Sequence, residues 1–126
     1  MAKRARILIV DDAANVRSNL RRWLEGAGHE VVGEAEDGTG AVALFQEQRP
    51  DLVTLDLVLP GMAGLHVLRN IAETVPGLPV VVLSALDGEK FISQALEAGA
   101  VDYLCKPLDR DRVLMAVDKA LVGGAG

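Results

Sequence analysis

The chain has little cysteine, no surplus of basic charge and no long hydrophobic run, and each of these scarcities excludes a class of protein. A single cysteine among 126 residues rules out an intrachain disulfide and favours a reducing compartment. The formal net charge of −5 argues against nucleic acid as a direct partner, because phosphate backbones select clustered Lys and Arg. No apolar run reaches the length of a membrane span or a signal-peptide core, so we predict a cytoplasmic protein without a membrane partner.

Short runs rich in β-branched residues alternate with longer segments whose apolar residues recur at helical spacing. The short runs cover residues 6–10, 30–35, 51–56, 79–84 and 101–105, and a helical segment follows each of them. Three of the runs are almost entirely apolar, as in parallel strands that helices cover on both faces. The pattern predicts one α/β domain with a doubly wound parallel sheet, a core over about residues 6–121 and a flexible tail at 122–126.

Polar residues follow four of the five predicted strands, at the point where each strand ends. They are Asp11 and Asp12, Asp56, Ser84 and Lys106. In an open α/β sheet, ligands bind outside the carboxyl ends of the strands, so these side chains should meet at one edge. Three neighbouring carboxylates call for a cation, and oxygen ligands suit Mg²⁺. We therefore predict a Mg²⁺ site at this edge.

Asp56 stands in the apolar run DLVTLDLVLP, where an unpaired buried carboxylate would be costly. Its position becomes tolerable if the strand ends at an open edge that is lined with cations. An ionised carboxylate beside Mg²⁺ can attack phosphorus and form an acyl phosphate. Lys106 and the hydroxyl of Ser84 would help to neutralise the oxygens of the transferred group.

Four stretches of the sequence resemble the receiver domains of two-component response regulators, in the order that this family has. They are ILIVDD, PDLVTLDLVLPGMAGL, VVVLSA and ALEAGAVDYLCKPL, and the resemblance covers residues from about Arg6 to Leu121. It implies a flavodoxin-like (βα)5 fold with strand order 2-1-3-4-5, as a single domain of the chemotaxis-regulator kind. It also implies a signalling switch rather than an enzyme, with a sensor histidine kinase or a histidine phosphotransfer protein as the phosphoryl donor.

The resemblance assigns the chemistry to particular residues. Asp56 would accept the phosphoryl group from a phosphohistidine. Asp11, Asp12, Asp56 and the backbone carbonyl of Val58 would hold Mg²⁺. Lys106 would pair with the phosphoryl group. The peptide bond between Lys106 and Pro107 would be cis.

The resemblance also implies a conformational switch. Ser84 would move to hydrogen-bond a phosphoryl oxygen, and Tyr103 would turn inward as it does so. Their movement would alter the face formed by the fourth helix, the fifth strand and the fifth helix, and thereby control a downstream partner. A phosphorylation-dependent homodimer through this face is common in the family, and we expect it as one possible outcome of the switch.

Three other functions are weighed against the sequence. An aspartate-nucleophile phosphatase needs a D-x-D pattern after the first strand and a larger chain that bears a cap. A flavodoxin-like cofactor binder needs a phosphate loop rich in Ser, Thr or Gly, whereas DDAANVR offers carboxylates. A receiver-like docking domain without phosphorylation would be expected to lack some of the five polar residues, all of which are present.

Several residues receive a plain structural reading. Asp37 is predicted to cap the second helix. Trp23 lies at helical spacing with core residues, and Cys105 is read as a small buried hydrophobic residue rather than a redox sensor. His29 is predicted to face solvent, and His66 has no partner at metal-ligand spacing.

The residues two positions beyond Asp56 and Ser84 bear on how long a phosphoryl group would last. They are Val58 and Leu86, and both are apolar. Neither side chain can orient an attacking water, a task that polar side chains perform in fast hydrolysis. The sequence therefore predicts a relatively long-lived phosphorylated state.

Overall fold

The computed structural model describes residues 4–124, and its strands and helices alternate strictly along the chain. The elements are β1 (Arg6–Val10), α1 (Ala14–Gly26), β2 (Glu30–Ala35), α2 (Gly38–Gln48), β3 (Leu52–Leu55), α3 (Gly64–Thr74), β4 (Val80–Ser84), α4 (Glu89–Glu97), β5 (Asp102–Cys105) and α5 (Arg110–Gly124). Each predicted strand agrees with the structure to within one residue at either end. Helix α5 extends past residue 121, the predicted end of the core, and residues 125–126 of the predicted tail lie outside the described residues.

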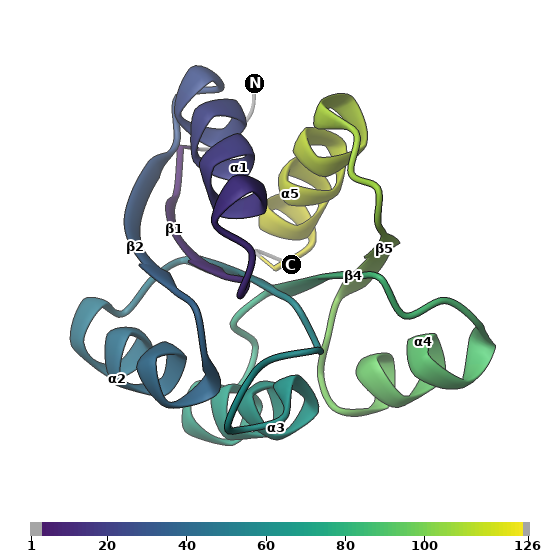
Figure 1. Ribbon diagram of the computed structural model, residues 1–126. Coiled ribbons are helices and arrows are strands. Elements are labelled where there is room, and N and C mark those ends of the chain that lie inside the picture. Colours follow the sequence, from purple (N-terminus) through teal and green to yellow (C-terminus); the bar gives the residue numbers. More distant parts are fainter. Residues whose placement is uncertain (1–3, 125–126) are drawn as a thin grey trace.

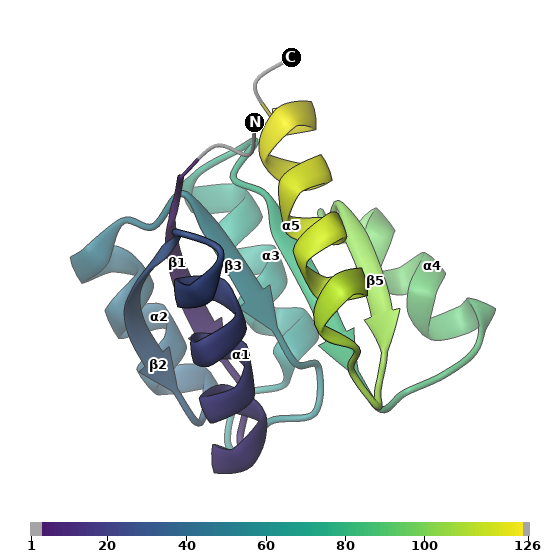
Figure 2. The ribbon, with the colours of Figure 1, turned by 90° about the horizontal axis from the view of Figure 1, so that it is seen from above.

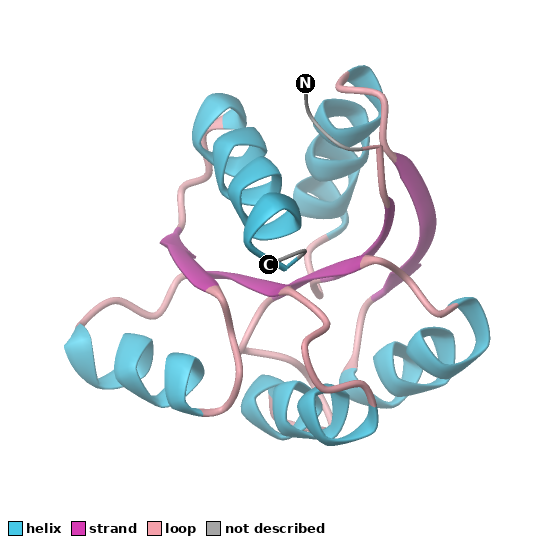
Figure 3. Ribbon diagram, turned by 180° about the vertical axis from the view of Figure 1, so that it is seen from behind, coloured by secondary structure: helices cyan, strands magenta, loops and turns pink. Residues whose placement is uncertain are grey.

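The five strands form one parallel sheet in the order β2-β1-β3-β4-β5 (Figure 1). Helices α1 and α5 cover one face of the sheet, and α2, α3 and α4 cover the other (Figure 3). Seen from above, α1 and α5 both run along the sheet, and their first turns lie at the end to which the strands point (Figure 2). The doubly wound, flavodoxin-like fold predicted from the sequence is confirmed.

Alternate residues of the strands pack into two apolar layers, one on each side of the sheet. Ile7 and Ile9 of β1 pack with α1 and α5, whereas Leu8 and Val10 pack with α2 and α3. All residues of β3 and β4 are buried, which explains why these runs are almost continuously apolar. With the strand interiors filled in this way, polar side chains gather at the strand ends.

The predicted cap of α2 is confirmed, because the Asp37 carboxylate accepts a hydrogen bond of 2.7 Å from the backbone N–H of Gly40. Trp23 is half-buried and packs against the layer between α1 and α5. Cys105 is half-buried rather than buried, because β5 is an edge strand whose residues are all only partly covered. Among residues 4–124, no helix combines the length and the apolar character that crossing a bilayer requires.

The prediction that His29 faces solvent is wrong. Gly28 adopts a left-handed conformation, with φ of 94°, and this turns the chain so that the His29 side chain is buried. Its Nδ1 accepts a 3.1 Å hydrogen bond from the backbone N–H of Ala5, and its Nε2 lies 4.0 Å from Asp118 on α5. Burial lowers the pKa of His29, an effect that the Asp118 charge opposes. The ring therefore joins three parts of the chain.

Candidate functional site

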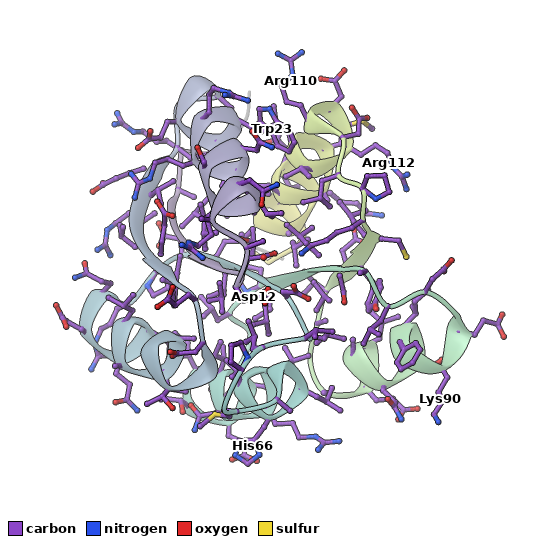
Figure 4. All side chains as sticks on the ribbon, viewed as in Figure 1. Asp12, Trp23, His66, Lys90, Arg110 and Arg112 are labelled. Atoms are coloured by element: carbon purple, nitrogen blue, oxygen red, sulfur yellow. The ribbon has the colours of Figure 1, made fainter. Side chains whose placement is uncertain are left out.

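The loops that follow β1, β3, β4 and β5 bring all five predicted polar residues to the same end of the sheet. Since β1 and β3 are neighbours, the acids that follow them lie close together: the backbone N–H of Asp56 donates to the carbonyl of Val10 at 2.9 Å. In a view onto this end of the molecule, Asp12 lies at the centre (Figure 4). The strand order thus brings together residues that are far apart in the sequence. Asp11 and Lys106, for example, are separated by 95 positions.

Asp11, Asp12 and Asp56 form an acid cluster. Each offers a carboxylate oxygen, and the three oxygens all lie within 4.8 Å of one another. Asp11 and Asp56 are buried, with exposed fractions of 1 % and 4 %, whereas Asp12 is exposed and open to an incoming ion. A small set of carboxylate oxygens with access to water fits a hard divalent cation such as Mg²⁺. The acid cluster can therefore bind a metal.

The ammonium of Lys106 bridges the two buried acids. Its Nζ donates to Asp11 at 2.7 Å and to Asp56 at 3.0 Å. Burial by itself would lower the pKa of Lys106, but the hydrogen bonds and charges of the two acids outweigh it, so the pKa is raised and the ammonium is retained. The lysine thus supplies a local positive charge to the acid cluster.

The remaining oxygens of the buried acids are held by backbone groups. Asp11 accepts a 2.9 Å hydrogen bond from the N–H of Ala13, and Asp56 accepts one of 3.1 Å from the N–H of Val58. Burial nevertheless raises the pKa of Asp11, with the bonds from Lys106 and Ala13 acting in the opposite direction. Asp56 is tolerated in its apolar run because both of its oxygens have donors at the strand end.

Two predicted switch residues bond the backbone of the same residue, Leu86, in the loop between β4 and α4. The fully buried Ser84 accepts a 3.2 Å hydrogen bond from the N–H of Leu86, and the hydroxyl of Tyr103 donates to the carbonyl of Leu86 at 2.6 Å. Burial raises the pKa of Tyr103. On the far side of Ser84, its carbonyl accepts a 2.8 Å bond from the N–H of Lys106. The two side chains are therefore linked to each other and to the acid cluster.

The peptide bond between Lys106 and Pro107 is cis. It lies directly after β5, where the chain turns toward α5. The backbone N–H of Lys106 is held by β4 at the same point, so the lysine is anchored to the sheet before its side chain reaches the acids.

Arg17 belongs to the site, although it was not among the predicted residues. Its guanidinium donates to the backbone carbonyl of Asp11 at 2.7 Å and to Glu34 at 3.2 Å. Glu34 is on β2, opposite Ile9 of β1. The position of Glu34 could have been predicted, because parallel pairing of the first two strands puts it near the end of the first strand. The contact itself depends on the direction in which the Arg17 side chain extends.

Comparison with known proteins agrees with this geometry. Residues 7–118 match the family model of the response regulator receiver domain. The chain belongs to this family. A receiver domain is a signalling phosphoacceptor rather than a catalytic enzyme, so the alternative of an aspartate-nucleophile phosphatase is excluded.

Individual relatives match this receiver domain over nearly their whole length. It is 42 % identical over 116 residues to the chemotaxis protein CheY of Bacillus subtilis, which covers 92 % of this chain and 97 % of that protein. The CheY of Thermotoga maritima is 40 % identical over 114 residues, which is 90 % of this chain and 95 % of that protein. Among solved structures, the CheX–CheY–BeF3–Mg²⁺ complex from Borrelia burgdorferi matches with a TM-score of 0.86 and 35 % identity, covering 89 % of this chain and 85 % of that one.

Proposed function

We propose that Asp56 accepts a phosphoryl group from a phosphohistidine of a sensor histidine kinase or a histidine phosphotransfer protein. The observation that carries this proposal is the contact between Asp56 and Lys106, at 3.0 Å, within the acid cluster. A buried carboxylate with a partner ammonium and two further acids beside it is the arrangement that phosphoryl transfer requires.

In the proposed step, a carboxylate oxygen of Asp56 attacks phosphorus. One O–P bond forms, the N–P bond of the donor breaks, and its electron pair stays on the imidazole nitrogen of the donor. The product on this chain is an acyl phosphate. The ammonium of Lys106 contacts Asp56, and Ser84 ends β4, the strand next to β3, so both groups are placed to bond the oxygens of the arriving group.

Asp11, Asp12, Asp56 and the backbone carbonyl of Val58 would hold Mg²⁺, which when bound supplies charge neutralisation for the phosphoryl oxygens. Because Lys106 bonds both buried acids, its charge competes with the ion for the same carboxylates. The choice of Mg²⁺ is supported by the oxygen-only ligand set and by the Borrelia burgdorferi CheY complex, which contains this ion.

The output would come from the face formed by α4, β5 and α5. Helices α4 and α5 and the residue before β5 carry exposed apolar side chains, namely Leu96, Met115, Val122 and Val101. Movement of Ser84 toward the phosphoryl group would break its bond to Leu86, which also holds Tyr103 of β5. We propose that a downstream protein or a second copy of this chain binds the altered face. The cytoplasmic location stays a prediction from the sequence.

The test is the mass of the intact protein after incubation with acetyl phosphate, with and without Mg²⁺. A single phosphate adduct that needs Mg²⁺ and is absent in Asp56→Asn would support the proposal. Asp51→Asn is the matched control, because Asp51 precedes β3 as Asp56 follows it and bonds only the backbone of Arg6 at the other end of the strand. The control should be phosphorylated as the wild type is.

The absence of an adduct under every condition would be checked by binding of beryllofluoride, which mimics the phosphoryl group without turnover. If beryllofluoride also fails to bind, the acid cluster does not accept phosphate, and the chain is a receiver-like docking domain. If beryllofluoride binds, light scattering with and without it shows whether the activated chain dimerises.

A further inference from the structure

We propose that Arg17 is a positioning residue for the metal site: its guanidinium, anchored by Glu34, holds the peptide between Asp11 and Asp12 where the two acids can share one cation. The inference rests on the proposed function in one respect, namely that the acid cluster binds Mg²⁺. It concerns residues that contribute no ligand atom.

The contacts of Arg17 come from two different nitrogens of its planar guanidinium. Nη1 donates to the Asp11 carbonyl at 2.7 Å, and Nε donates to Glu34 at 3.2 Å. Only 15 % of the Arg17 side chain and 27 % of the Glu34 side chain are exposed. Two bonds from one rigid plane fix the orientation of the group, which a lysine ammonium would not do.

The Asp11 carbonyl lies where the β ladder ends. The last residue pair between β1 and β2 joins Val10 to Ala35, and the Asp11 N–H still reaches the Ala35 carbonyl at 3.0 Å. Within residues 4–124, no backbone N–H donates to the carbonyl of Asp11. A buried carbonyl without a donor is costly, and Arg17 is the group that satisfies this one. The same bond fixes the plane of the peptide that leads into Asp12.

The charge of Arg17 and its positioning role would act on the metal site in opposite directions. Arg17 lies one turn into α1, where the positive end of the helix dipole disfavours a cation by about 0.3–1 kcal/mol. The guanidinium also repels a divalent cation in the acid cluster. If charge alone mattered, removal of Arg17 would tighten Mg²⁺ binding. If position matters, the same change weakens it, so the two explanations predict opposite signs.

Arg21 provides a matched control on the same helix. Its Nε donates to the other oxygen of Glu34 at 2.6 Å, and its Nη1 donates to Glu25 at 3.1 Å. Arg17 and Arg21 therefore share Glu34, yet only Arg17 contacts the metal-site backbone. Replacing either with methionine removes an ion pair with Glu34 and keeps a long side chain on α1.

The experiment is a calorimetric titration of wild type, Arg17→Met and Arg21→Met with MgCl₂, after thermal unfolding has shown each variant to be folded. We expect the dissociation constant of Arg17→Met to rise about tenfold, the lower end of what loss of an outer partner of a metal ligand costs. The dissociation constant of Arg21→Met should stay within about twofold of the wild-type value, well below the tenfold change that corresponds to 1.4 kcal/mol. Arg17→Lys, which keeps the charge but lacks the rigid planar donors of the guanidinium, should also bind more weakly than wild type.

A second variant and a second readout guard against a folding defect at Arg17. Glu34→Gln keeps the guanidinium and loosens its anchor, so its Mg²⁺ affinity should fall by about threefold, part of the full effect. Amide hydrogen exchange should quicken at Ala13, whose N–H donates to the Asp11 carboxylate, in Arg17→Met and Glu34→Gln, but not in Arg21→Met. Faster exchange at this position relative to the rest of α1 reports on the loop itself rather than on a uniform loss of stability of the helix.

The outcomes separate the inference from the proposed function. A wild type that binds no Mg²⁺ refutes both. A wild type that binds Mg²⁺, together with an Arg17→Met variant that binds it as tightly or more tightly, refutes the positioning role alone. Equal weakening in the Arg17→Met and Arg21→Met variants also refutes it, because the effect would then belong to the shared ion pair.

Discussion

Replacing Gly64 with alanine is expected to destabilise the protein and to displace the backbone of Asp56. Gly64 is the first residue of α3, and its N–H donates to the carbonyl of Leu57 at 3.0 Å. A methyl group added there would lie 2.5 Å from the carbonyl oxygen of Asp56 and closer still to the Cα of Leu57. Both neighbours are backbone atoms, so no flexible side chain can move aside. The start of α3 fits against β3 only without a side chain.

The size of the effect can be worked from these contacts. Ordinary contact begins at 3.4 Å, so the peptide after Asp56 must move by about 0.9 Å to accept the methyl group. Overpacking of this kind costs about 2 kcal/mol, which lowers the Tm of a domain of this size by roughly 8 °C. Because a misplacement of about 1 Å at a reacting group can cost about 100-fold in rate, phosphorylation of Asp56 should slow by up to that factor.

Thermal unfolding followed by circular dichroism measures the first effect, and the rate of adduct formation with acetyl phosphate measures the second. Gly123→Ala is the matched control, because a methyl group at Gly123 on α5 would meet nothing within 4 Å. This control should match the wild type or gain about 0.5 kcal/mol, as glycine-to-alanine changes in helices do. A Gly64→Ala variant with the Tm and phosphorylation rate of the wild type would show that the close approach does not constrain the site.

Three other substitutions test pH dependence, phosphoryl lifetime and competition for the acids. Because burial lowers the pKa of His29 below its ordinary value of 6.5, the unfolded chain binds the proton more readily, and the free energy of unfolding should fall as the pH drops below that value. Urea denaturation at several pH values should show this loss in the wild type and a smaller loss in His29→Gln. Val58 is 51 % exposed and apolar, and Leu86 is half-buried, so Val58→Asn combined with Leu86→Asn should speed decay of the phosphate adduct by about tenfold. Lys106→Met should bind Mg²⁺ about tenfold more tightly, because one charge-assisted bond worth about 1.5 kcal/mol no longer competes for the acids. Calorimetric titration measures that gain, and the same variant should be phosphorylated more slowly.

Each of these three has an outcome that would contradict it. Equal pH dependence in the wild type and His29→Gln would show that another group is responsible. Equal decay of the phosphate adduct in the wild type and the double variant would show that a different group sets its lifetime. Weaker Mg²⁺ binding by Lys106→Met would mean that the ammonium supports the metal site rather than competing with the ion.

Much of the site could be predicted because the fold converts sequence position into spatial position by a simple rule. The apolar strands 52–55 and 80–84 need helices on both faces, which forces parallel pairing and puts all strand ends at one edge. Any polar residue that follows such a strand must then come to that edge. Asp56 and Lys106 could be paired in this way, although 50 positions separate them.

The features that the sequence did not reveal depend on the direction and burial of individual side chains rather than on where the strands end. His29 is buried because one left-handed glycine redirects the chain, and composition around a turn does not show in which direction the next residue points. The contact between Arg17 and Asp11 needs the length of an arginine, an acid on the neighbouring strand and a carbonyl without a ladder partner. Cys105 was read from its apolar neighbours, whereas its burial depends on its place in an edge strand.

The backbone of Leu86 has a consequence for motion. Ser84 holds its N–H and Tyr103 holds its carbonyl, so the two side chains bond successive peptide planes that turn relative to each other only about the φ and ψ angles of this one residue. Relaxation experiments on Ser84 and Tyr103 should therefore yield similar exchange rates rather than two unrelated ones. A leucine whose side chain takes no part in the chemistry would then set the common timescale on which the hydroxyl of a serine and the ring of a tyrosine change place.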